Sequence, residues 1–180
     1  MHQLVLLVSL FCMVSSAFAS SDPATSLASA MNQRMQVMKD VAGYKSAHHL
    51  PVEDLVREQK VLAAAQAEAG EAGVDPQSVA PFIQAQMDAA KAIQYRYLAD
   101  WLSRPEPDWK PANLEDVRAR ISQYDNVILK TISEQLKSGG FSDGERAQLL
   151  SLLNAPQLSG ADKQRLVDSL ALIKSKIPGQ

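Results

Sequence analysis

Six residues near the start of the chain recur at alternating spacings of four and three, and two of them are cations. They are Leu27, Met31, Arg34, Met38, Val41 and Lys45. This spacing is typical of the core-facing stripe of an amphipathic helix, so Arg34 and Lys45 should both point inward, about three turns apart. Because an unpaired buried cation is costly, the pattern predicts a helical protein in which something anionic meets these two side chains.

A second stripe further along the chain has the same rhythm and carries an amide. Its members are Ile83, Met87, Ala90, Gln94, Tyr97 and Trp101. The polar side chain of Gln94 again falls where a packed helix usually has an apolar one. Together the two stripes predict an interior built around an anionic ligand.

The first 19 residues have the pattern of a cleaved export signal. Residues 4–14 are an apolar run too short to span a membrane, and Ala17-Phe18-Ala19 supplies the small residues that a signal peptidase prefers. We expect cleavage before Ser20, which leaves residues 20–180 as a single domain with no membrane span. The expected location is the periplasm or the medium outside the cell.

Composition narrows the chemistry of the mature chain. Cys12 is the one cysteine and lies in the expected leader, so disulfides, thiolate nucleophiles and cysteine-bound metals are not expected. His48 and His49 are adjacent and cannot form a pair of ligands one turn apart on a helix. We therefore expect no metal and no cofactor. The net charge of −2 argues against binding to nucleic acid, which usually requires a strong basic excess.

The mature chain predicts an all-α fold of about six helices. Three long helices at about 24–48, 52–70 and 76–103 should form the core of the site, with Asp75-Pro76 starting the third. A proline-rich linker follows at 104–113, because no helix tolerates prolines so closely spaced. The C-terminal half, 114–178, should contain a helix from Asn113 to Lys137 and two shorter helices that begin at capping boxes, at Ser142 and Ser159.

Further charged residues accompany the two stripes, and each has an ordinary explanation. Arg57 and Glu58 lie near the start of the second helix beside Asp54, and nearby acids could neutralise this arginine. Arg118 lies at the edge of an apolar stripe and could be a paired surface residue. Lys45 lies near a helix end, where a lysine can reach solvent and favour the helix dipole. Arg34 is the hardest to explain in this way, because no acid lies three or four residues from it.

Taken together, the spacing of these residues resembles the all-helical chorismate mutases, and in particular their exported subclass. The resemblance spans residues 27–101 and is carried by 32–45, 50–58 and 82–101. Its most specific feature is the pair of gaps, 11 and 12 residues, that separate Arg34, Lys45 and Arg57. The C-terminal half resembles the family more weakly, through Leu114 and Arg118. The resemblance implies a chorismate mutase fold of type II and, in the exported subclass, a pocket completed by the C-terminal helices of the same chain.

The activity that the resemblance implies is the isomerisation of chorismate to prephenate, a step of phenylalanine and tyrosine biosynthesis. The roles it implies are carboxylate binding by Arg34, Arg57 and Arg118, and donation of hydrogen bonds by Lys45 and Gln94 to the ether oxygen of the breaking bond. Glu58 would accept from the ring hydroxyl of the substrate, and Asp54 would support the site or contact the ligand. A homodimer with a complete site in each chain is the expected assembly.

Two positions distinguish this chain from the family pattern. Ala90 occupies a position that carries Ser or Thr in family members, so a hydroxyl contact to a substrate carboxylate is missing or is supplied by another residue. Gln94 replaces a Glu that some exported members use in its protonated form. An amide donates at any ordinary pH, so little activity should be lost between mildly acidic and neutral pH.

Two other kinds of protein fit parts of the sequence. One is a non-enzymatic periplasmic helical protein, such as a chaperone or adaptor, which does not require Arg34, Lys45 and Gln94 to point inward. The other is a degenerate relative that binds a carboxylated metabolite without turning it over, which Ala90 keeps open.

Overall fold

The computed structural model describes residues 22–176, and these residues form seven α-helices with no extended strand. The predicted all-α class is therefore confirmed, and the expected leader with its cleavage site lies outside the described residues. None of the described helices is long and apolar enough to cross a membrane. The helices are α1 Pro23–Gln36, α2 Met38–Ala47, α3 Leu55–Glu71, α4 Pro76–Ser103, α5 Leu114–Lys137, α6 Asp143–Leu152 and α7 Gly160–Leu170.

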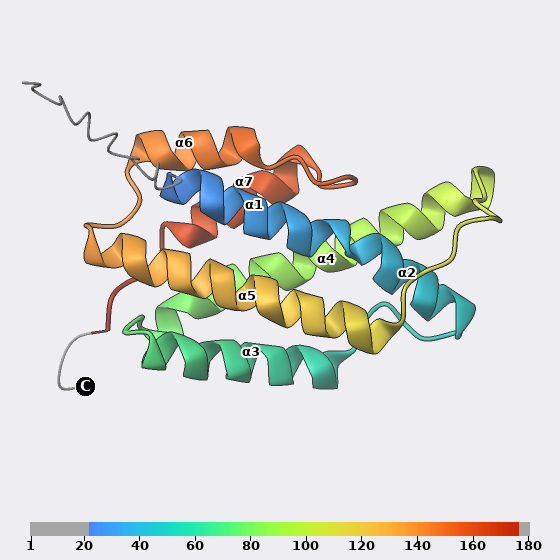
Figure 1. Cartoon of the computed structure of the whole chain (residues 1–180), viewed down its shortest axis with the longest axis horizontal. Helices are drawn as coiled ribbons and strands as arrows, with labels where there is room; N and C mark the ends of the chain where they lie inside the picture. The colour runs from blue at the N-terminus through green and yellow to red at the C-terminus, as the bar shows by residue number, and fades with distance from the viewer. Residues whose placement is uncertain (1–21, 177–180) are drawn as a thin grey trace, which may run out of the picture.

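The helix expected over 24–48 is divided into α1 and α2 at Val37, which accounts for the difference between six and seven helices. Val37 keeps right-handed helical angles, with φ −70° and ψ −6°, so α2 continues α1 end to end (Figure 1). No proline or glycine marks this point in the sequence. The apolar stripe survives the break, because Leu27, Met31, Met38 and Val41 are all buried.

The second long helix begins three residues later than expected, at Leu55 instead of Val52. Asp54 is its N-cap, and its side chain accepts a hydrogen bond from the backbone N–H of Arg57 at 3.0 Å. A capping carboxylate satisfies a donor that has no partner within the helix, so the helix starts after it. Residues 51–54 are consequently a loop, and this loop forms part of the site described below.

The other helix boundaries follow their local signals. Asp75 caps α4, which ends at Ser103 as expected, and Asn113 caps α5, which ends at Lys137. Ser142 and Ser159 form complete capping boxes at the starts of α6 and α7. These signals are short-range hydrogen bonds, which explains why they can be read directly from the sequence.

The linker 104–113 is anchored to α2 by side-chain contacts. Lys39 bonds the carboxylate of Glu106 at 2.6 Å, and its amine lies 4.6 Å from the ring centroid of Trp109. The backbone N–H of Ala112 donates to Asp40 at 3.0 Å. These contacts determine where α5 begins relative to α2.

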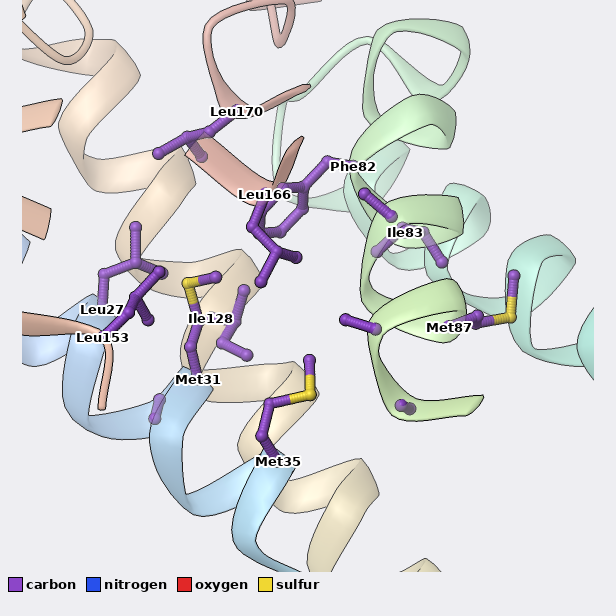
Figure 2. Packing of buried hydrophobic residues seen from close by; sticks show 14 of the residues in the cluster. Leu27, Met31, Met35, Phe82, Ile83, Met87, Ile128, Leu153, Leu166 and Leu170 are labelled. Atoms are coloured by element: carbon purple, nitrogen blue, oxygen red, sulfur yellow. The ribbon is translucent and has the colours of Figure 1, made fainter. Parts of the chain in front are cut away.

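The helices pack around α1, α4 and α5. Figure 1 shows α5 running antiparallel to α1 and α2, with α4 crossing behind them, α3 along the lower edge and α6 and α7 along the upper one. Figure 2 shows Met31 and Met35 of α1, Phe82 of α4, Ile128 of α5 and Leu166 of α7 meeting in one apolar core. This core holds α1, α4 and α5 in place, and the adjoining parts of α2, α3, α4 and α5 carry the polar side chains.

Candidate active site

A cavity of about 130 Å³ lies among α1 to α5 and the loop before α3. The structure places all seven side chains selected from the sequence in its wall: Arg34, Lys45, Asp54, Arg57, Glu58, Gln94 and Arg118. They come from five helices and one loop, so only the tertiary fold brings them together. The remainder of the wall is mostly apolar and includes Val41, Met87 and Ile121.

Arg34 is buried, with 4% of its surface exposed. Its Nε donates to the carboxylate of Asp125 on α5 at 2.6 Å, which supplies the anionic partner that the sequence demanded. Its Nη1 is also buried and has no hydrogen-bond partner among the described residues. A guanidinium offers five N–H donors in a planar fork, so the contact with Asp125 leaves binding capacity for a second anion.

Lys45 lies at the end of α2 and turns towards the loop before α3. Its Nζ donates to the carbonyl oxygen of Val52 at 2.6 Å. Burial lowers the pKa of Lys45 below its ordinary value, and the nearby Arg118 adds to this effect. The carboxylates of Asp54 and Glu58 act in the opposite direction. The amine is thus part of the cavity wall, and the two carboxylates do not fully offset the effects of burial and Arg118 on its pKa.

Gln94 is 4% exposed and lies on the inner face of α4. Its Nε2 donates to the carbonyl oxygen of Ala90 at 3.1 Å and lies 3.9 Å from the sulfur of Met38. Its Oε1 has no hydrogen-bond partner among the described residues. An amide carries two N–H donors; one contacts the helix backbone, and the other faces only the sulfur of Met38, a weak acceptor that a ligand oxygen could replace.

The start of α3 carries two carboxylates with different partners. Asp54 caps the helix, as described above, and its own backbone N–H lies 3.4 Å from Glu58. Glu58 forms an ion pair with Lys91 of α4 at 2.9 Å. Arg57 lines the cavity and has no ion pair among the described residues, so the local neutralisation considered from the sequence is absent there.

Arg118 reaches the cavity from the first turns of α5 and also pairs with Glu115 at 2.6 Å. The side chain of Glu115 is 77% exposed, and an ion pair of this kind contributes little to stability. Arg118 is therefore both paired at the surface and part of the cavity wall.

Two residues of the site were not assigned from the sequence. Lys91 lines the cavity beside Ala90, and hydrogen bonding to Glu58 raises its pKa. It lies three residues before Gln94, on the same helix face, and that spacing was a usable signal. Asp125 lies seven residues after Arg118, two turns along the same face of α5, but nothing local connects it with Arg34.

The described lining is strongly cationic and contains no hydroxyl, thiol or imidazole side chain. Five cationic side chains face two carboxylates, and no Ser, Thr, Cys or His is among them. The hydroxyl that Ala90 lacks is therefore not supplied by another side chain of this wall. Such a cavity can bind a small molecule with several negative charges and stabilise charge that develops on it, because its donors are already in place.

Comparison with known proteins agrees with this chemistry. The family described as chorismate mutase type II matches residues 25–95. A monofunctional chorismate mutase from Enterobacter agglomerans is 47% identical over 176 residues, which cover 96% of this chain and 97% of that protein. A secreted chorismate mutase from Yersinia pestis is 44% identical over 147 residues, which cover 81% of this chain and 79% of that protein.

The fold is similar to solved structures as well. The crystal structure of the secreted chorismate mutase from Yersinia pestis superposes with a TM-score of 0.79 at 41% identity, covering 87% of this chain and 100% of that one. The agreement extends beyond α4 into the C-terminal helices that the family match does not reach. The chain therefore belongs to the chorismate mutase family, and within it to the all-helical group that has secreted members.

Proposed function

We propose that this protein converts chorismate to prephenate in the cavity described above. The observation that supports this site most directly is that five cations and Gln94 gather in one described cavity wall, which carries no hydroxyl, thiol or imidazole side chain. In this rearrangement a C–O bond breaks as a C–C bond forms in one concerted step, and no proton is transferred. A protein can accelerate it by restraining the reactive conformer and by stabilising charge on the ether oxygen.

The three arginines are proposed to hold the two carboxylates of the substrate. Arg34 approaches from α1, Arg57 from α3 and Arg118 from α5, so the ligand would be gripped from three directions. The guanidinium fork suits a bidentate contact with a carboxylate. The unpartnered Nη1 of Arg34 supports this role, because a buried donor without a partner is costly until a ligand binds it.

Lys45 and Gln94 are proposed to act on the ether oxygen. They approach the cavity from α2 and α4. Lys45 has N–H donors beyond the one used in the structure, and one N–H of Gln94 faces only the weakly accepting sulfur of Met38. A donor that is already directed at developing charge is typically worth about 3–4 kcal/mol in the transition state. Lys45 adds a charge to this effect, whereas Gln94 contributes only its dipole.

Glu58 is proposed to accept a hydrogen bond from the ring hydroxyl of the substrate. Its ion pair with Lys91, at 2.9 Å, holds the carboxylate in the cavity wall. Asp54 is proposed to act through structure, by capping α3 and so orienting Arg57 and Glu58. The chaperone-like alternative has no use for these inward charges.

A direct assay tests the proposal. We would purify residues 20–180 and follow the loss of chorismate absorbance, with Arg34→Ala as the diagnostic variant. Wild-type protein should turn over chorismate, and Arg34→Ala should weaken substrate binding and lower kcat/KM with it, because its carboxylate contact is made both before and during the reaction. A folded wild-type protein that binds chorismate without turnover would instead identify the degenerate relative.

Export is supported by the secreted relatives, and we propose that residues 1–19 are removed to give a periplasmic protein. The secreted chorismate mutases of Yersinia pestis and Mycobacterium tuberculosis are similar to this chain over 81% and 71% of its length. Sequencing the N-terminus of the exported protein should give Ser20 as the first residue. An intact Met1 on the exported protein would contradict cleavage.

We also propose a homodimer in which each copy carries a complete site. All the residues in the cavity wall belong to one chain, so the site requires no side chain from a second copy. Light scattering coupled to gel filtration should give twice the mass of the chain. The activity per chain should not change on dilution below the concentration at which the dimer dissociates.

A further inference from the structure

A second cavity lies directly behind the first. Its volume is about 260 Å³, and it lies between α3 and α5. Arg34, Arg57 and Val61 line both cavities, whereas Asp125 lines only the second. Arg34 therefore separates the two, and Asp125 contacts it from the side away from the proposed reaction cavity.

The contact between these residues is limited to one edge of the guanidinium. Asp125 accepts from Nε at 2.6 Å, and Nη1 remains buried without a partner among the described residues. An ion pair that served packing alone would usually satisfy the buried donors together, since each one left unmade is costly. Here Asp125 holds the Nε edge of the guanidinium and leaves Nη1 for a ligand.

We propose that Asp125 is a positioning residue, which orients Arg34 so that its free edge meets a substrate carboxylate. This inference rests on the proposed function. It means that α5 contributes two residues to substrate binding, Arg118 directly and Asp125 through Arg34. The arrangement resembles an outer-shell carboxylate that holds a binding group in one rotamer. Without it, the arginine has several rotatable bonds and no anchor for its guanidinium.

Asp125 cannot help by attracting the substrate directly, because both are negatively charged. A carboxylate near the site repels an anionic substrate, so its charge alone would weaken binding. Its benefit must therefore come from holding Nε in place. An asparagine at 125 can still accept from Nε through its side-chain oxygen while losing the charge, and an alanine can do neither.

The test compares Asp125→Ala and Asp125→Asn with the wild-type protein in steady-state kinetics. We expect Asp125→Ala to raise KM by about tenfold or more, because a misdirected binding group costs up to about a hundredfold. Asp125→Asn should keep KM within about threefold of wild type. Glu134→Ala is the matched control, since Glu134 lies on the same helix and pairs only at the surface, 3.7 Å from Lys130.

A double-mutant cycle shows whether Asp125 acts through Arg34. In an Arg34→Ala background, Asp125→Ala should not raise KM further, because the group it positions is gone and the substitution then removes only the repulsion between the carboxylate and the substrate. Additive effects, or equal KM values in the Asn and Ala variants, would overturn the positioning role. If Asp125→Ala fails to fold, Asp125→Glu takes its place: it keeps the charge but displaces the carboxylate, and a wild-type KM would refute the inference.

The outcome for wild-type protein separates this inference from the proposed function. Loss of chorismate by the wild type with a normal KM in Asp125→Ala would leave the function standing and remove only the inference. Absence of turnover by a folded wild-type protein would remove both.

Discussion

Lys45 and Gln94 reach the same cavity from different helices, yet they contribute in different ways. Lys45 brings a charge whose pKa is lowered by burial, and Gln94 brings a neutral amide on a fully packed face. In the proposed function the arginines would meet carboxylates that are charged both before and during the reaction, whereas these two donors would meet an oxygen that gains charge only in the transition state. Substitutions at the two kinds of position should therefore separate binding from turnover.

Replacing Lys45 by alanine should lower kcat by about a hundredfold to a thousandfold while changing KM much less. The reason is that a donor to developing charge acts mainly in the transition state. Steady-state chorismate kinetics measure both constants. Lys130→Ala, at an exposed position on α5, is the control and should match wild type. A loss confined to KM would show that Lys45 only binds the ground state.

The dependence of activity on pH should show the ionisation of Lys45. Burial places the pKa of Lys45 below its ordinary value of 10.5, and the neutral amine formed above that pKa is the poorer donor. Activity should therefore fall as pH rises through that pKa, and the fall should occur at lower pH in kcat/KM than in kcat, because a bound dianion favours the charged amine.

Because position 94 is a glutamine, activity should not depend on pH on the acidic side. Between about pH 5 and pH 7.5 the wild type should change little, since an amide does not titrate. Gln94→Glu should lose activity over this interval as the carboxyl ionises and ceases to donate. A steep loss in the wild type over the same interval would contradict the assignment of Gln94.

At the scale of helices, the site depends on how the linker 104–113 is held against α2. Gly43 lies on the face of α2 that meets Trp109, and an added Cβ there would lie 2.6 Å from the ring. The ring is confined by Trp101, whose centroid is 5.5 Å away, and by the amine of Lys39. The close approach at Gly43 thus sets the position of the linker and, through it, of Leu114 and Arg118.

Gly43→Ala should lower the free energy of unfolding by about 1–3 kcal/mol, although alanine is the better helix former. Chemical denaturation followed by circular dichroism measures this change. Gly144→Ala in α6 is the matched control, because its Cβ would meet nothing nearer than 4.0 Å. That variant should be unchanged in stability or slightly more stable. Equal changes in unfolding free energy at the two positions would show that the Trp109 ring can move to admit the added methyl group without cost.

Helix positions were predictable where short-range signals determine them. Asp75, Asn113, Ser142 and Ser159 form caps with residues two or three positions away, and four helix starts follow from them. The division at Val37 has no such signal, so a continuous helix was the natural expectation. The start of α3 was placed too early because Pro51 outweighed the capping aspartate that follows it.

For the molecule as a whole, α6 and α7 contribute packing rather than residues of the proposed reaction cavity. Leu149 of α6 is buried, and so are Leu153, Leu166 and Leu170, which lie in the apolar core (Figure 2). α6 packs against α1 and α7 against α4, and no local pattern in the sequence indicates these partners. The same limit applies to Asp125, whose partner lies 91 residues away in the chain. Long-range partners of this kind depend on packing, and no local pattern records them.

Leu166→Ala should cost about 2–5 kcal/mol of unfolding free energy, because it opens a cavity in the core. Once folded, the variant should keep the KM of the wild type, since Leu166 is absent from the cavity wall. Leu172→Ala removes the same atoms from a side chain that is 54% exposed and should change stability by less than about 0.5 kcal/mol. Urea denaturation with parallel kinetics compares the two. Similar losses of stability would mean that α7 does not close the core.

The seven side chains of the proposed site all come from one copy of the chain, and this has a consequence for mixtures of defective proteins. In an enzyme whose sites are shared between subunits, two different inactive variants can restore one another when they assemble together. Here a copy that lacks Arg34 and a copy that lacks Lys45 each carry their own lesion into their own site. Co-expressing or co-refolding the two should yield no recovered turnover, because the activity of each copy depends on its own residues.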